Sequence, residues 1–303
     1  MPIHLTSLTR RRFLQAAGAS VFWSGRRAIG VEADDVETDL VYLINDTHIG
    51  KKQPTDSKVT SQLRQVISEL VKRPKQPACV LMNGDLALKD GQAGDYRHFA
   101  KLIRPLQDAG IETHLTLGNH DDRKVFYEIM NEQRPEDSLV ESRHVSVVET
   151  MHANFFLLDS LQKTMVTQGT IGTQQLNWLA SALDASKDKP AIIVTHHNPR
   201  LGGDPLHFPG GLIDSQELWN VIAPRKWVKA YIHGHIHDRT YAEHQGIHIL
   251  NTPATSYVAD PKKSTTGWTT ARLTKGGVTL TTQTNDQSHP WNGNTKSLQW
   301  RSM

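Results

Sequence analysis

Five short polar clusters, each at the end of a predicted β-strand, constrain this chain more than any other feature of its sequence. The strands are apolar runs at residues 40–44, 79–82, 114–117, 192–194 and 228–232. The clusters are Asp46-Thr47-His48, Gly84-Asp85, Gly118-Asn119-His120-Asp121, His196-His197 and Gly234-His235-Ile236-His237. Asp, Asn and His side chains bind divalent metals, and open α/β sheets bind ligands at the carboxyl ends of their strands. The sequence therefore predicts a site for two metal ions at one sheet edge.

The chemistry of phosphate esters indicates what such a site can do. Their anionic oxygens repel nucleophiles, and the transition state spreads charge over several oxygens. Two cations about 3.5–4 Å apart bind these oxygens, lower the pKa of a bridging water and stabilise the leaving oxygen. Such a site needs one carboxylate shared by both metals and a separate set of ligands for each. The clusters offer enough groups for this, which favours hydrolysis of a phosphate ester.

Strands and helices alternate from residue 39 to residue 238, which is typical of an α/β domain. Apolar residues at helical spacing predict helices at residues 57–72, 96–108, 123–132, 173–185 and 215–222. Residues 143–149 and 154–159 predict a hairpin, and short antiparallel strands are predicted at residues 239–243, 246–250, 268–273 and 278–284. We expect a four-layer α-β-β-α sandwich of two mixed sheets. The domain would span residues 34–285, and the polar residues 286–303 would form a tail or a strap over the body.

The first 33 residues resemble a twin-arginine export signal. Arg10, Arg11 and Arg12 precede a short, weakly apolar stretch at residues 16–23, and Ala33 ends a fitting cleavage site. The apolar stretch is too short to span a bilayer, so no stable membrane span is expected. The resemblance implies export of the folded protein by the twin-arginine translocase, to the periplasm or the extracellular space. The alternative is a disordered basic leader or an N-terminal helix.

The charge of the chain does not favour nucleic acid as a partner. The formal net charge is +3, but residues 1–33 contain five arginines and one glutamate, so the remainder carries about −1. The mature chain therefore lacks the positive charge on which non-specific nucleic acid binding depends. Cys79 is the only cysteine, so no intramolecular disulfide can form. It lies in an apolar run and is expected to be a core residue.

The clusters resemble the sequence blocks of the calcineurin-like metallophosphoesterase superfamily, which are D-x-H, G-D, G-N-H-D/E, H and G-H-x-H. The blocks occur here in the same order, and the resemblance covers about residues 39–250. It implies that one metal is bound by Asp46, His48, Asp85 and His237. The other metal would be bound by Asp85, Asn119, His196 and His235, with Asp85 as the bridge. Taken singly, pairs such as Gly84-Asp85 are ordinary turns, so only the complete set indicates metal.

The resemblance also implies roles for two residues that do not bind metal. His120 would assist the leaving group, as general acid or as a donor to a phosphate oxygen. Asp121 would orient His120. The nucleophile would be a metal-bound hydroxide, and no covalent enzyme intermediate is expected. The mixed ligands suit two divalent or trivalent ions of Fe, Mn, Zn or Co.

One of the ligands is ambiguous in the sequence. Relatives commonly have H-H-P or H-x-P in this block, whereas here Asn198 separates His197 from Pro199. Counting from the end of the strand favours His196 as the ligand, and counting back from the proline favours His197. We predict His196 and keep His197 as the alternative.

Missing features narrow the branch of the superfamily. Purple acid phosphatases place a tyrosine three residues after the bridging aspartate, where this chain has Leu88. Protein serine/threonine phosphatases supply an arginine to the phosphate in Val-Asp-Arg-Gly; here only Lys89 or Arg123 could replace it. The chain is most similar to the class III cyclic-nucleotide phosphodiesterases, on details such as Asp95-Tyr96 and Leu158-Asp159-Ser160.

We therefore expect an exported, metal-dependent phosphoric ester hydrolase that acts on a small-molecule phosphoester, with phosphodiesters preferred over monoesters. One alternative is a broad-specificity phosphomonoesterase, and another is a non-catalytic module that binds a phosphorylated ligand. The complete ligand set favours the enzyme, because a binding module has no need to keep Asn119 and His120.

Overall fold

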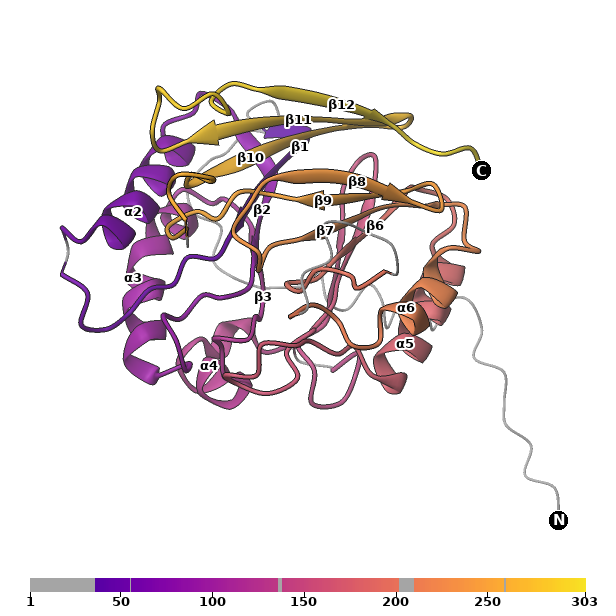
Figure 1. The fold of residues 1–303 in the computed structure, drawn as a ribbon, viewed down its shortest axis with the longest axis horizontal. Coiled ribbons are helices and arrows are strands. Elements are labelled where there is room, and N and C mark those ends of the chain that lie inside the picture. Colours follow the sequence, from indigo (N-terminus) through magenta and orange to yellow (C-terminus); the bar gives the residue numbers. More distant parts are fainter. Residues whose placement is uncertain (1–35, 55, 136–137, 202–209, 259) are drawn as a thin grey trace, which may run out of the picture.

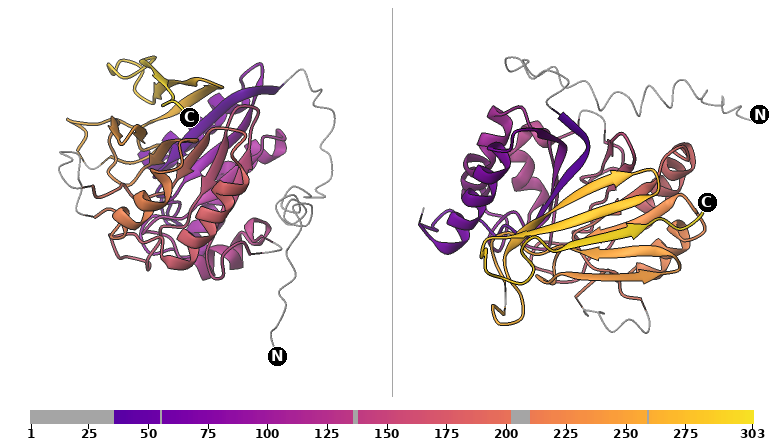
Figure 2. Two further views of the ribbon diagram at one scale, coloured as in Figure 1. Left: turned by 90° about the vertical axis from the view of Figure 1, so that its right-hand side faces the viewer. Right: turned by 90° about the horizontal axis from the view of Figure 1, so that it is seen from above.

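Two six-stranded sheets pack face to face at the centre of the molecule (Figure 1). The computed structural model describes residues 36–303, except residues 55, 136–137, 202–209 and 259. The predicted export signal at residues 1–33 lies outside the described residues. Helices stand on the two opposite sides of the pair of sheets (Figures 1 and 2).

The first sheet combines strands from both ends of the described chain, in the order β12-β11-β10-β1-β2-β3. The strands are β1 (Val36–Asn45), β2 (Gln76–Asn83), β3 (Thr113–Thr116), β10 (Gly267–Thr274), β11 (Gly277–Thr284) and β12 (Thr295–Gln299). β1, β2 and β3 are parallel to one another, whereas β10 pairs antiparallel with β1 and β11 pairs antiparallel with β10. The sheet is mixed, as predicted.

The second sheet has the order β4-β5-β6-β7-β9-β8. The strands are β4 (Ser146–Glu149), β5 (Asn154–Leu157), β6 (Ala191–Val194), β7 (Val228–His233), β8 (Thr240–His244) and β9 (Ile247–Asn251). β5, β6, β7 and β9 are parallel, and the antiparallel strands β4 and β8 form the two edges. The predicted hairpin of β4 and β5 is present.

The helices form where the sequence places apolar residues at helical spacing. The first sheet is covered by α2 (Lys58–Val71), α3 (Ala93–Asp108) and α4 (Arg123–Ile129), which a short 3-10 helix, η3 (Asn131–Gln133), follows. The second sheet is covered by α5 (Thr173–Ala185) and α6 (Ser215–Ile222). Within the part of the chain that the structure describes, we find no helix with the length and apolar character needed to cross a membrane.

Alternating side chains of the central strands define the layers. In β1, Tyr42 and Ile44 pack with the buried faces of α2 and α3. Val41 and Leu43 point to the other side, into a core that also holds Cys79 and apolar residues of β5, β6 and β7. A further core lies between the second sheet and its two helices. These three cores separate four layers, which confirms the predicted α-β-β-α sandwich.

The C-terminal residues differ from the sequence-based expectation. Residues 286–303 were expected to form a polar tail or a strap, but Thr295–Gln299 form strand β12, which pairs antiparallel with β11. Most side chains of β12 are exposed. Only Leu298 of this edge strand packs against the core, so the strand lacks the apolar alternation by which strands are predicted.

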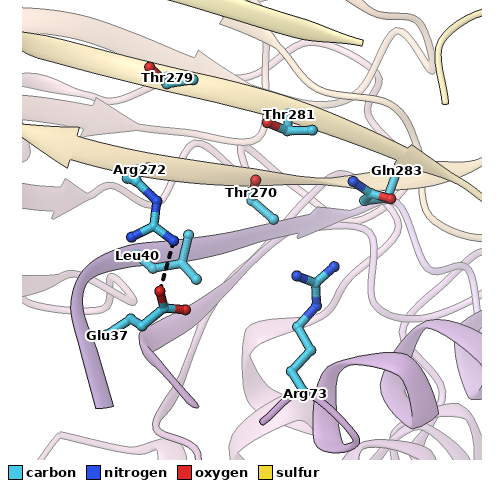
Figure 3. A pocket seen from close by; sticks show the side chains of 8 residues that line it. All are labelled: Glu37, Leu40, Arg73, Thr270, Arg272, Thr279, Thr281 and Gln283. Atoms are coloured by element: carbon cyan, nitrogen blue, oxygen red, sulfur yellow. Dashed lines mark hydrogen bonds and ion pairs between the residues drawn. The ribbon is translucent and has the colours of Figure 1, made fainter. Parts of the chain in front are cut away.

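A polar pocket lies on the outer face of the first sheet, over β1, β10 and β11 (Figure 3). Arg272 donates to the Glu37 carboxylate at 2.9 Å across it. The guanidinium carbon of Arg73 lies 4.9 Å from the ring centroid of Trp268. Glu37 and Leu40 belong to the amino-terminal half of β1, so this pocket is distant along the strand from the polar cluster that follows Asn45.

Candidate metal centre

The predicted ligands follow strands whose carboxyl ends meet at one edge of the sandwich. β1, β2 and β3 run parallel and lead to Asp46, Asp85 and Asn119, while β6 and β7 lead to His196 and His235. Both sheets therefore deliver polar side chains to the same place, as the strand-end clusters predicted.

Asn83, the last residue of β2, joins the two sheets beside this edge. Its Nδ2 donates to the backbone carbonyl of Thr195 at 2.6 Å, and its Oδ1 accepts from the Thr116 hydroxyl at 2.6 Å. The buried amide thus fixes the spacing between β2 and β6. Sequence analysis did not single out Asn83, although its position directly before Gly84-Asp85 was an available signal.

Two groups of potential ligand atoms lie side by side. The first contains Asp46, His48, Asp85 and His237, and the second contains Asp85, His196 and His235; within each group the ligand atoms lie within 4.8 Å of one another. His237 Nε2 is 3.1 Å from Asp46 Oδ1, and His196 Nε2 is 3.3 Å from Asp85 Oδ2. Only Asp85 belongs to both groups, which is the arrangement that a dinuclear centre requires.

The donor atoms that face the centre fit metal cations because hydrogen bonds do not satisfy them. Among the described residues, Asp46 Oδ1, Asn119 Oδ1 and His196 Nε2 are buried without a hydrogen-bond partner. One oxygen of each carboxylate is engaged, since Asp46 Oδ2 accepts from the backbone N–H of His235 and Asp85 Oδ1 accepts from that of His120. Buried polar atoms without partners are costly, and a bound cation removes this cost.

Backbone carbonyls orient two of the imidazole rings. Nδ1 of His196 lies 3.0 Å from the carbonyl oxygen of Asn83, and Nδ1 of His48 lies 3.4 Å from that of Leu88. A proton on Nδ1 can be donated to these carbonyls, which leaves the Nε2 lone pair directed at the carboxylates. Such outer contacts fix the tautomer and the ring direction of a metal-binding histidine.

Backbone strain is concentrated in the same cluster. Of the described non-glycine residues with positive φ, five are predicted ligands: Asp46, His48, Asp85, His235 and His237. Left-handed conformations of such residues cost on the order of 1–3 kcal/mol each, and they often mark functional sites. Gly118 also permits close approach, because a Cβ atom there would lie 2.2 Å from Asp85 Oδ1.

The electrostatics of the cluster favour positive charge. Burial alone would raise the pKa of Asp46, but His237, His48 and His196 hold this pKa well below its ordinary value. Burial likewise opposes protonation of His196, yet the Asp85 carboxylate raises the pKa of this imidazole to about 9. Both carboxylates are therefore ionised, and their charge attracts either protons or cations.

The structure distinguishes the two adjacent histidines. His196 belongs to the second group, whereas His197 lies outside both groups. Nδ1 of His197 is 2.8 Å from the Ser160 hydroxyl, and its ring centroid is 4.6 Å from that of His235. Burial holds the pKa of His197 well below its ordinary value. His196 therefore lies among the candidate ligand atoms, whereas His197 packs on the His235 ring outside both groups.

His120 lies at the exposed side of the centre, but Asp121 does not orient its ring. Nδ1 of His120 is 2.7 Å from the carbonyl oxygen of Lys89. The Asp121 carboxylate instead accepts from the backbone N–H groups of Leu86, Ala87 and Gly118 and from the Tyr96 hydroxyl. Burial, with Asp85 nearby, raises the pKa of Asp121 to about 6. Asp121 thus positions the loops that carry Asp85 and Asn119.

Arg123, one of two residues that could replace the phosphate-binding arginine of protein phosphatases, has another partner. Its Nη2 donates to Asp159 Oδ1 at 2.8 Å and also to the backbone carbonyl of Leu161. Asp159 is fully buried, so this ion pair holds the guanidinium in place. In this arrangement the Arg123 guanidinium binds Asp159 and Leu161 and has a structural role.

The four-layer sandwich and the shared carboxylate together define a class of protein, the metal-dependent phosphoesterases. The calcineurin-like phosphoesterase family matches residues 40–239, which is more than half of the chain. The chain belongs to this family.

Curated relatives agree with the family and with the predicted branch. The 3′,5′-cyclic adenosine monophosphate phosphodiesterase CpdA of Vibrio vulnificus is 28% identical over 250 residues, covering 79% of this chain and 87% of that protein. A probable cyclic nucleotide phosphodiesterase of Psychrobacter arcticus is 29% identical over 241 residues, covering 73% and 81%. The prediction of a metal-dependent phosphoric ester hydrolase is thereby confirmed.

Solved structures share the fold. A dimetal phosphatase from Danio rerio superposes with a TM-score of 0.67 at 15% identity, covering 87% of this chain and 99% of that one. GAP50, the anchor in the inner membrane complex of Plasmodium, gives a TM-score of 0.59 at 12% identity, covering 87% and 89%. At these identities the likeness shows the fold alone.

Proposed function

We propose that this protein is an exported phosphodiesterase with a dinuclear metal centre. The observation that carries the proposal is Asp85, which is the one carboxylate shared by both groups of ligand atoms. The unpartnered atoms of Asp46, Asn119 and His196 around it support the same interpretation. Bound at such a centre, two cations neutralise the phosphate and activate a water molecule.

Each metal would have its own ligands. Asp46, His48, Asp85 and His237 would hold one metal, and Asp85, Asn119, His196 and His235 would hold the other. The first set and three members of the second are the groups that lie together in the structure. The family resemblance assigns Asn119 to the second set, and its buried Oδ1, which has no hydrogen-bond partner among the described residues, supports a role as a ligand.

His120 would act on the leaving group. Its Nε2 lies 4.0 Å from Asp85 Oδ2, and its side chain is 28% exposed, so a phosphate at the centre can reach it from the solvent side. The Lys89 carbonyl holds the ring through Nδ1. When Nε2 carries a proton, it can donate this proton to the leaving oxygen or bind a phosphate oxygen.

We infer that the substrate is a small phosphodiester, with cyclic nucleotides as the first candidates. The relatives from Vibrio and Psychrobacter support this, as does a relative from Mycobacterium tuberculosis that is named a cAMP/cGMP dual specificity phosphodiesterase and is 29% identical over 236 residues. A panel of cyclic AMP, glycerophosphodiesters, nucleotides and aryl mono- and diesters, each with defined metals, would identify the preferred class. Faster turnover of every monoester would instead indicate a phosphomonoesterase.

We also propose that the protein is periplasmic or extracellular. The support is the sequence of residues 1–33, with its consecutive arginines Arg10, Arg11 and Arg12. Fractionation of cells that make the full chain should find the protein outside the cytoplasm. Replacement of the three arginines by lysine should retain it in the cytoplasm, and unchanged export of that variant would exclude the twin-arginine route.

The decisive test of the activity compares two variants with the wild-type protein loaded with Mn²⁺. The wild type should cleave bis-p-nitrophenyl phosphate, and His120→Ala should lower kcat by about 10²- to 10⁴-fold while the metal content stays the same. Asp85→Asn should lose both metal and activity. Metal content near zero in the wild type, with no turnover in any added metal, would contradict the proposed function.

A further inference from the structure

An exposed aromatic ring borders the metal centre. Tyr257, in the segment between β9 and β10, has 46% of its surface exposed. Its ring centroid lies 5.5 Å from that of His48 and 5.3 Å from that of His237, in edge-to-face contacts. The ring thus contacts two candidate ligands, while much of its surface faces solvent.

Two more exposed apolar residues contact the candidate ligands through their backbones. Leu88 is 43% exposed, and its carbonyl oxygen contacts His48 Nδ1. Met165 is 48% exposed, and its backbone N–H donates to the carbonyl of Asn119 at 2.8 Å. We name Leu88, Met165 and Tyr257 the apolar rim. Its members come from three separate segments, which follow β2, β5 and β9.

The segment that carries Met165 is held in an unfavourable backbone conformation. Met165 has φ 68°, which is unfavourable for a residue with a side chain. The neighbouring Thr164 hydroxyl donates to the carbonyl of Asp121 at 2.8 Å, so this segment is fixed to the loop after β3. A strained residue held against a candidate site suggests a functional role for its position.

The candidate ligands of the centre are polar groups that suit the phosphate part of an ester rather than its organic part. The His48 ring contacts the rings of both Tyr257 and His120, so an ester group that projects toward His48 lies near both. Ligand sites commonly combine a few polar anchors with apolar and aromatic walls. The rim supplies such a wall for the organic part of the substrate.

We propose that Tyr257 binds an aromatic group on one ester oxygen of the substrate by stacking, and that Leu88 and Met165 contact its apolar parts. This rests on the proposed function, since phosphate at the metals brings the group to the ring. Stacking tolerates different bases, because every base has a π-face. Tyr257 therefore selects aromatic diesters over alkyl diesters with little discrimination among bases.

The test uses two ligands that cannot be hydrolysed as esters. In benzylphosphonate and ethylphosphonate a CH₂ group replaces the ester oxygen, and the pair differs by the aromatic ring. Calorimetric titration of the Mn²⁺-loaded protein should show that Tyr257→Ala weakens benzylphosphonate binding by about five-fold or more, with ethylphosphonate unchanged. Tyr257→Phe should retain wild-type binding. Met151→Ala removes an exposed apolar side chain at the β4–β5 turn and should change neither ligand.

The outcomes separate this inference from the proposed function. Equal loss for both ligands, no loss in Tyr257→Ala, or no binding of benzylphosphonate to the loaded wild type would overturn the role of Tyr257. Selective binding in a protein that cleaves no diester would leave this role intact and reject the proposed activity. Turnover of aryl and alkyl diesters with no effect of Tyr257→Ala on either KM would support the proposed activity and reject the role of Tyr257.

Discussion

At the residue scale, residues outside the two groups of candidate ligand atoms hold the ligand side chains in position. The buried Ser160 hydroxyl lies 2.8 Å from His197 Nδ1, and a Cβ atom on Gly169 would lie 2.4 Å from the same nitrogen. His197 in turn packs on the ring of His235. Ser160 and Gly169 thus set the position of His197, and His197 restricts the movement of a candidate ligand.

We expect Ser160→Ala to destabilise the protein. The change leaves a buried ring nitrogen of His197 without its partner, which costs about 1–3 kcal/mol in the free energy of unfolding. Urea unfolding monitored by circular dichroism measures this difference. Ser61→Ala, which removes an exposed hydroxyl bonded to a backbone carbonyl in α2, is the matched control and should change little. Equal effects of the two variants would contradict the assigned role of Ser160.

Sequence patterns could place the cluster but not every contact within it. Asp46 and Asp85 were predictable because each follows an apolar strand whose end lies at a known edge. Counting from the strand end favoured His196, but the Asn83 carbonyl that contacts its Nδ1 belongs to another strand and left no signal in that count. The sequence also did not indicate the partners of Asp121. The backbone N–H of Asp121 donates to the Gly118 carbonyl, and this turn brings the Asp121 carboxylate to the Gly118 N–H rather than to the His120 ring.

At the scale of elements, His144 connects helix α4, strand β3 and the segment before β4. Its Nδ1 lies 2.7 Å from the Tyr127 hydroxyl, and its Nε2 lies 2.9 Å from the carbonyl oxygen of Leu115. The backbone N–H of His144 donates to Asp159. A neutral ring satisfies both side-chain contacts, with Nε2 protonated and Nδ1 accepting. Burial lowers the pKa of His144 accordingly.

This burial predicts a loss of stability in acid. Below pH about 6.5 the unfolded chain binds a proton at this position and the folded protein does not. The free energy of unfolding therefore decreases as the pH is lowered through this range. His144→Gln can keep both contacts without titrating. Urea unfolding at pH 7.5 and 5.5 should therefore show a smaller decrease in the variant than in the wild type. Identical decreases would exclude His144 as a contributor.

The elements themselves were largely predictable, and the exceptions have physical reasons. The helices and inner strands bury one face or both, which leaves a clear apolar period in the sequence. Strand β12 is mostly exposed and packs only Leu298 against the core, so its residues carry no such period. The parallel pairing of β9 with β7 also was not predicted, because pairing partners distant in sequence leave no local pattern.

At the scale of the whole molecule, the C-terminus joins the two sheets. Arg301, just beyond β12 of the first sheet, donates to the backbone carbonyls of Val228, Arg225 and Gln245 at 2.8–2.9 Å. Val228 begins β7 of the second sheet. This contact lies at the opposite end of β7 from the candidate metal centre.

We expect Arg301→Ala to lower the free energy of unfolding by about 1.5–3 kcal/mol, as for hydrogen bonds to charged groups. Metal content and kcat should stay at wild-type values. Arg301→Lys should recover little, because an ammonium group lacks the planar fork of a guanidinium. Lys296→Ala removes an exposed positive charge from β12 and serves as control. Loss of metal without loss of stability would contradict this assignment.

The strand order of the first sheet has a consequence for synthesis of the chain. β1 leaves the ribosome first among its strands, yet its neighbour β10 and the outer strands β11 and β12 leave last. Pairings between such distant segments form slowly, and an N-terminal fragment holds β1 with one edge unpaired. His237, which completes the first group of ligand atoms, also comes late in the chain. The first group of ligand atoms therefore stays incomplete until His237 has been synthesised, so a chain that stalls before β8 lacks a full set of candidate ligands.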